Sequence, residues 1–61
     1  MNEDEFRAAM ARASRANDIL HVADDEAFGV AVGYDSARGV IILHGNHEMP
    51  MAGARLIGQF A

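Results

Sequence analysis

Two histidines and a glutamate within five residues are the part of this 61-residue chain whose side chains could hold a metal ion. His44 and His47 stand three positions apart, Glu48 follows directly, and His21 lies on an earlier segment. Imidazole and carboxylate groups are ligands of Zn²⁺ and Ni²⁺, but this spacing reproduces no closed four-ligand site. We therefore assign no metal and no cofactor, and keep a metal-binding or metal-stabilised protein using His44 and His47 as an alternative.

The Gly-Asn-His-Glu block at residues 45–48 follows an apolar run and resembles one motif of the calcineurin-like metallophosphoesterases. The resemblance implies that Asn46 is a metal ligand and that His47 contacts a phosphoryl group. It covers four of the 61 residues. The family's Asp-x-His block, its Gly-Asp block and its later histidines have no counterpart here, since two residues separate Asp18 from His21. A two-metal site draws ligands from several strand ends, so the activity is not assigned.

Covalent catalysis and nucleotide binding also lack the residues that they need. The chain has no Cys, and Ser14 and Ser36 belong to no Gly-x-Ser-x-Gly motif. The glycine-bearing segments match neither the Gly-x-Gly-x-x-Gly nor the Walker pattern. We therefore predict a protein that is not an enzyme.

The composition indicates a small acidic protein that associates with another chain. Nine Asp and Glu residues against five Arg and no Lys give a net charge of −4, which disfavours a nucleic-acid partner. Hydrophobic residues make up 51% of the chain, while a domain of this size buries only about 60% of the surface that its unfolded chain exposes. The apolar surface that the chain cannot bury within itself predicts a homodimer and a protein partner. Arginine without lysine, beside many Ala and Gly, suggests a GC-rich bacterial or phage source.

The sequence shows no recognisable targeting segment. The first 15 residues lack a basic start followed by an apolar run. The longest apolar block, residues 40–43, is far shorter than the roughly 20 residues of a membrane span. We expect a cytoplasmic protein with no membrane partner.

The residues before Asn17 predict a helix at about 3–16. Asn2 and Glu5 have the spacing of a capping box, and three acidic residues fill the first turn. Apolar side chains recur at the spacing of one helical face, at Phe6, Ala9, Met10 and Ala13.

Three short segments then predict strands, at about 19–23, 27–34 and 40–44. Residues 27–34 alternate, with large apolar side chains on one face and Ala or Gly on the other, leaving room for a close neighbour such as the helix. Residues 35–39 suit a hairpin loop. The near-continuous apolar run at 40–44 predicts a strand covered on both faces.

The last segment predicts a second helix at about 50–60, beginning at Pro50. Gly53 and Gly58 each cost such a helix roughly 1 kcal/mol, so packing must hold it. The whole chain is then a single domain, residues 1–61, of the α+β class: a three-stranded antiparallel meander with a helix at each end, in the order α-β-β-β-α, forming a dimer.

The leading functional hypothesis is a non-enzymatic protein-interaction module, an inhibitor or regulator from a bacterium or phage that docks on a partner protein. Another alternative is an antitoxin-like dimeric regulator using the arginines of the first helix, Arg7, Arg12 and Arg15. The interface residues expected from the apolar strand and the last segment are Val40, Ile42, Met49, Met51, Leu56, Ile57 and Phe60.

Overall fold

The computed structural model describes residues 1–60, which form one α-helix followed by five β-strands. The elements are α1 (Glu3–Ala16), β1 (Ile19–Ala23), β2 (Phe28–Asp35), β3 (Val40–Leu43), β4 (His47–Pro50) and β5 (Arg55–Phe60). All neighbouring strands are antiparallel, in the order β4-β3-β2-β1-β5. The first four strands therefore form a meander, and β5 returns across the sheet to pair with β1.

Helix α1 has the ends that its sequence predicts. The Asn2 side chain accepts from the Glu5 backbone N–H at 2.8 Å, and the Glu5 carboxylate accepts from the Asn2 N–H at 3.1 Å, which completes the capping box. At the other end Asn17 adopts a left-handed conformation (φ 58°), and the Asp18 N–H donates to the Ala13 carbonyl oxygen. Within residues 1–60, no helix has the length and apolar surface that crossing a bilayer requires.

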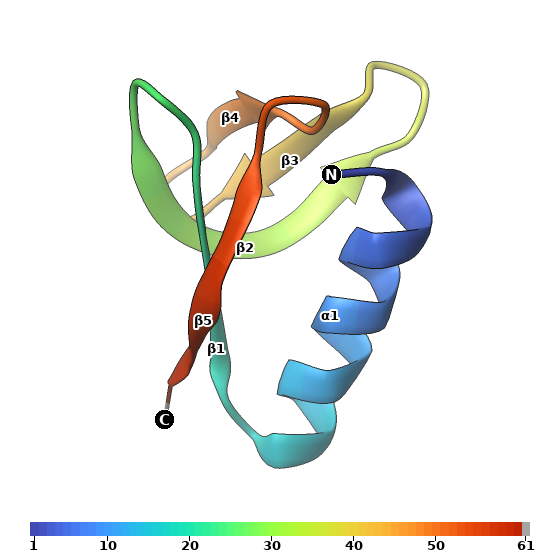
Figure 1. Ribbon diagram of the computed structural model, residues 1–61, viewed down its shortest axis with the longest axis vertical. Coiled ribbons are helices and arrows are strands. Elements are labelled where there is room, and N and C mark those ends of the chain that lie inside the picture. Colours follow the sequence, from blue (N-terminus) through green and yellow to red (C-terminus); the bar gives the residue numbers. More distant parts are fainter. Residues whose placement is uncertain (61) are drawn as a thin grey trace.

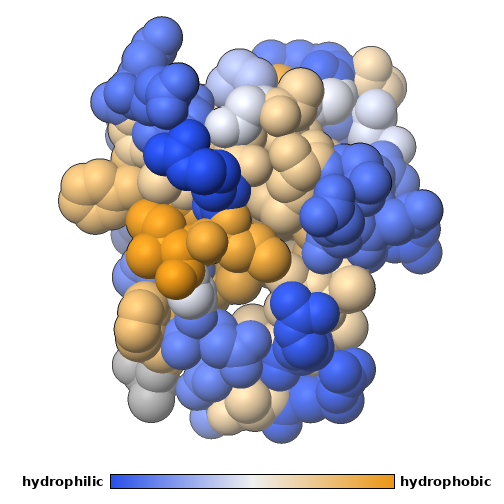
Figure 2. Space-filling model, in the orientation of Figure 1, coloured by the Kyte–Doolittle hydropathy of each residue, from blue (hydrophilic) through white to orange (hydrophobic). Residues whose placement is uncertain are grey.

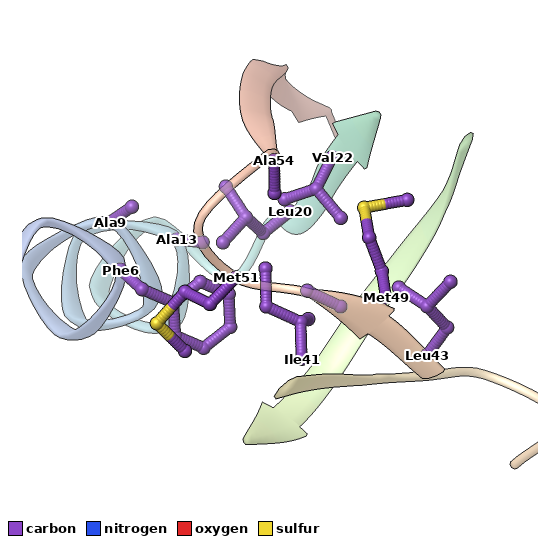
Figure 3. Close-up of a cluster of buried hydrophobic side chains, with 11 residues drawn as sticks. Phe6, Ala9, Ala13, Leu20, Val22, Ile41, Leu43, Met49, Met51 and Ala54 are labelled. Carbon is purple, nitrogen blue, oxygen red and sulfur yellow. The ribbon is translucent and has the colours of Figure 1, made fainter. Parts of the chain in front are cut away.

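The sheet curves around one hydrophobic core, with α1 alongside it. Figure 1 shows β2 bending strongly, with β1 and β5 toward one end and β3 and β4 toward the other. Figure 3 shows Phe6 extending from α1 toward Met51 and Ile41. The buried residues come from every element except β5: Phe6, Ala9, Ala13, Leu20, Val22, Ala31, Ile41, Leu43, Met49, Met51 and Ala54.

Strand β2 contains an irregularity that changes which side chains face the core. Its register with β3 shifts between Ala31 and Gly33, as at a β-bulge. Before the bulge Ala31 is buried; beyond it Tyr34 points to the core side, where its ring packs edge-on against Phe6 at 5.6 Å. The alternating large row expected over residues 27–34 is therefore split between the two faces of the sheet.

The expected second helix at residues 50–60 is wrong, and so is the three-stranded meander with a helix at each end. The segment instead ends β4 at Pro50, turns at residues 51–54 and forms β5. Gly53 and Gly58 destabilise a helix in this segment. A strand here instead forms hydrogen bonds with backbone groups of β1 that would otherwise lie unpaired at the edge of the sheet. The α+β class stands, with five strands and one helix in residues 1–60.

Gly29, in the row of small residues on β2, lies against a β3 side chain. A Cβ added at Gly29 would lie 3.0 Å from Cδ1 of Leu43, which is buried. We predict that Gly29→Ala lowers the free energy of unfolding by about 1–2 kcal/mol, because Leu43 has little room to move. Gly33→Ala in the same strand, where a Cβ meets nothing within 4 Å, is the control. Urea unfolding measures both, and equal effects would contradict this packing.

Candidate protein-interaction surface

The Gly-Asn-His-Glu block at 45–48 spans the turn between β3 and β4 and the start of β4. Gly45 and Asn46 have positive φ angles of 87° and 65°, and the Asn46 N–H donates to the Leu43 carbonyl oxygen at 3.1 Å. Glycine and asparagine tolerate this left-handed backbone best. Backbone conformation therefore accounts for the Gly-Asn pair, including the residue that the phosphoesterase resemblance implied as a ligand.

Glu48 is bound by Arg38, which comes from the turn between β2 and β3. Arg38 Nη1 donates to Oε2 at 2.7 Å and Nη2 donates to Oε1 at 2.5 Å. These hydrogen bonds, reinforced by the charge of the guanidinium, lower the pKa of Glu48, and the same contact raises the pKa of Arg38. Both groups lie at the surface, so their main effect is to hold β4 beside the turn.

The three histidines are not gathered into a metal site. His44 and His47 are exposed, in the turn and at the start of β4. The His44 N–H donates to the Val30 carbonyl oxygen, and Val30 pairs with His21, so His21 and His44 stand two strand spacings apart, about 10 Å. The described part of the chain holds no group of three or more His, Cys, Asp or Glu side chains placed to hold a metal ion.

The face of the sheet that points away from the core carries several large apolar side chains, together with His21 and Glu48. Leu20 and Val22 of β1 face the core, so the residues that alternate with them face outward. Their partners on the neighbouring strands face the same way, since Ile19 pairs with Phe60 and Ala23 with Phe28. We call this surface the outer-face patch, and it consists of Ile19, Phe28, Val30, Val32, Ile42 and Phe60.

The aromatic members of the outer-face patch differ in how they are held. Phe28 is 76% exposed and Phe60 55% exposed. The ring of Phe60 packs edge-on against His21, with 5.1 Å between ring centroids, and covers Gly58, where an added Cβ would lie 3.1 Å from it. The ring of Phe60 therefore has contacts within the sheet, whereas Phe28 is the more exposed of the two.

Strand β5 adds apolar side chains at one edge of the sheet. Leu56 is 41% exposed and Ile57 is 53% exposed. Figure 2 shows strongly hydrophobic atoms gathered over β5 in this view. The register between β5 and β1 passes from Leu56 to Gly58, which leaves Ile57 in a bulge outside the regular ladder. The outer-face patch and the β5 edge meet at Phe60.

The interface residues expected from the sequence fall into different places. Leu56, Ile57 and Phe60 are exposed on β5, while Val40 and Ile42 are partly exposed on β3. The other two lie in the core: Met49 is 1% exposed and Met51 is 5% exposed. The interface itself stays a prediction.

Sequence reasoning passed over Phe28, the most exposed large apolar side chain of the described residues at 76%, and Val32. Both were placed in an apolar row together with Tyr34, which would have been a core face in a regular strand. The bulge after Ala31 breaks that row. The sequence feature that could have indicated their exposure is the small size of the chain. A chain this short has few helices, and one helix cannot cover both faces of a sheet.

Comparison with known proteins gives this chain no relative: no family model, no curated protein and no solved structure matches it.

The contact between Arg38 and Glu48 gives a prediction about acid stability. Because the folded state lowers the pKa of Glu48 from its ordinary 4.5, the contact stabilises the fold above that pH and this contribution disappears as the pH falls through the lowered value. The melting temperature of Glu48→Gln should therefore lie below that of the unmodified chain at neutral pH, and the gap should close in acid. Arg38→Gln, which removes the same contact, should behave alike in circular-dichroism melts. A gap that persists at the lowest pH would contradict the assignment.

Proposed function

We propose that this chain is a small acidic protein-interaction module that acts by binding another protein through the outer-face patch and not by catalysis. One observation carries the proposal: large apolar side chains line one face of the sheet although the core is complete without them. Phe28, Phe60 and Val32 are each more than half exposed. Contiguous apolar surfaces larger than a few hundred Å² are rare on monomers and typically mark binding sites.

The surroundings of the patch indicate the chemistry of the partner. Asp18 directly precedes Ile19, and the acidic turn at residues 24–26 leads into Phe28, so acids stand at both ends of the patch. Arg55 neutralises part of this charge through Asp25 at 3.1 Å. With a net charge of −4, the chain suits a partner that has an apolar surface with a basic rim.

The placement of the hydroxyl groups agrees with a binding role. Ser36 lies in a turn, where its hydroxyl donates to the Glu3 carboxylate, and Ser14 is exposed on α1. A small acidic module that binds another protein fits the class of inhibitors or regulators of bacterial or phage origin. The described residues include no group of three His, Cys, Asp or Glu side chains that could hold a metal ion. On the helix of the antitoxin-like alternative, Arg7 lies 4.0 Å from Asp4, whose negative charge opposes its own.

The proposal predicts that Phe28→Ser weakens partner binding without unfolding the protein. A buried aromatic anchor contributes more than about 2 kcal/mol at a typical interface, so the dissociation constant should rise about 30-fold. The free protein should keep its stability within about 0.5 kcal/mol, because the side chain is exposed. The partner is first captured from a lysate of the native host and identified, then purified for calorimetric titration.

Arg12→Ala, on the exposed side of α1, is the matched control and should bind as the unmodified chain does. Binding should also weaken as salt is raised, because the acids at both ends of the patch face a basic rim. If Phe28→Ser and Arg12→Ala bind a purified partner equally well, the outer-face patch is not the docking site.

A further inference from the structure

The two edges of the sheet, β4 and β5, differ in their ability to accept another strand. β5 is six residues long and contains neither proline nor lysine, the residues that commonly block an edge. Its single charged residue, Arg55, is paired with Asp25. The bulge at Ile57 twists the strand, which is the one edge-protecting feature that β5 has. β5 therefore presents free backbone groups beside exposed Leu56 and Ile57.

The β4 edge is closed by its sequence and its contacts. The Met51 N–H donates to the Gly39 carbonyl oxygen, and the alternation of an antiparallel ladder then turns the N–H groups of Met49 and His47 toward β3. The outward positions are 48 and 50. Pro50 has no N–H, and Glu48 places a negative charge on this strand, where Arg38 binds it. A strand approaching β4 finds little to bond.

From these two edges we infer that β5 pairs antiparallel with β5 of a second copy, which joins two five-stranded sheets into one. Pairing β5 with β4 of another copy would build a ring or a filament, but the closed β4 edge opposes it. Pairing like edges about a two-fold axis uses the open edge of each copy and ends at two chains. The inference concerns the β5 edge and does not depend on a partner for the outer-face patch.

The charges around β5 permit a second copy at this edge although the chain as a whole is acidic. Two molecules of charge −4 repel, so they must meet where acids are few. The residues of β5 include no Asp or Glu. Antiparallel pairing also places the two Arg55 side chains at opposite ends of the strand pair, roughly 17 Å apart, which is beyond the Debye length of about 8 Å.

The area of the contact sets its strength. Two copies bring together only two six-residue strands and the exposed side chains of Leu56, Ile57 and Phe60, so the contact area is small. This lies below the standard size of a stable complex, so the dimer should exchange with monomer at about 10 µM or higher. The two-fold axis leaves both outer-face patches on the same side of the joined sheet.

The first test measures mass in solution. Multi-angle light scattering on the full chain, from about 1 µM to about 1 mM, should show the mass rise from 6.6 kDa toward twice that value and no further. Ile57→Lys should raise the dissociation constant at least tenfold, because lysine blocks a strand edge. Val32→Lys is the matched control, since Val32 and Ile57 are both 53% exposed. Circular-dichroism melts confirm that both variants fold.

The second test reports the geometry of the pair. The chain has no Cys, so one introduced cysteine gives a site-specific probe. Ile57→Cys lies near the middle of β5 and should form an intermolecular disulfide, because residues near the axis approach within bonding distance. Arg55→Cys at the end of the strand should cross-link far less.

The outcomes separate this inference from the proposed function. A dimer that Ile57→Lys disrupts and Val32→Lys leaves intact supports β5 pairing, whatever the outer-face patch binds. A monomer at all concentrations, growth beyond two chains, or equal cross-linking of Ile57→Cys and Arg55→Cys would overturn it. Because Phe28→Ser leaves the β5 edge intact, it should impair partner binding without changing the mass.

Discussion

The single helix of the described residues can cover only one face of the sheet, and the rest of the structure depends on this limit. The sheet curves so that its inner face, together with α1, encloses the core around Phe6 and Ile41. The outer face receives no second layer from residues 1–60, although it carries large apolar side chains such as Phe28 and Val32. In larger domains the second face of such a sheet is buried against further elements. Here the uncovered face and the β5 edge are the two surfaces at which we propose that other molecules bind.

Local signals were sufficient for the first two thirds of the fold. The helix expected at 3–16 coincides with α1 because its caps and its apolar stripe act within one segment. The strands expected at 19–23, 27–34 and 40–44 coincide with β1, β2 and β3 to within one residue at each end. The last segment failed because its identity depends on a distant partner. Pro50 suits the first turn of a helix and an edge strand equally, and only the free edge of β1 decides between them.

The candidate surface was partly predictable for a reason independent of secondary structure. Leu56, Ile57 and Phe60 were expected at an interface because the chain holds more apolar side chains than it can bury, and that argument holds for a strand as well as for a helix. Met49 lies in the core because β4 pairs beside β3, which no local pattern revealed. Phe28 was missed because the bulge in β2 follows from pairing with β3 and leaves no mark in the alternation of residues.

A small core also links association to stability. A domain of this size is stable by only about 3–9 kcal/mol, so any molecule that binds the folded state alone adds a meaningful fraction of that free energy. A partner on the outer-face patch and a second copy at β5 would both act in this way, since both surfaces exist only when the sheet is formed. The apolar side chains on the outside therefore need not stabilise the isolated fold. Under both proposals they would contribute once covered, and the concentration of the covering molecule would then influence how much of the chain is folded.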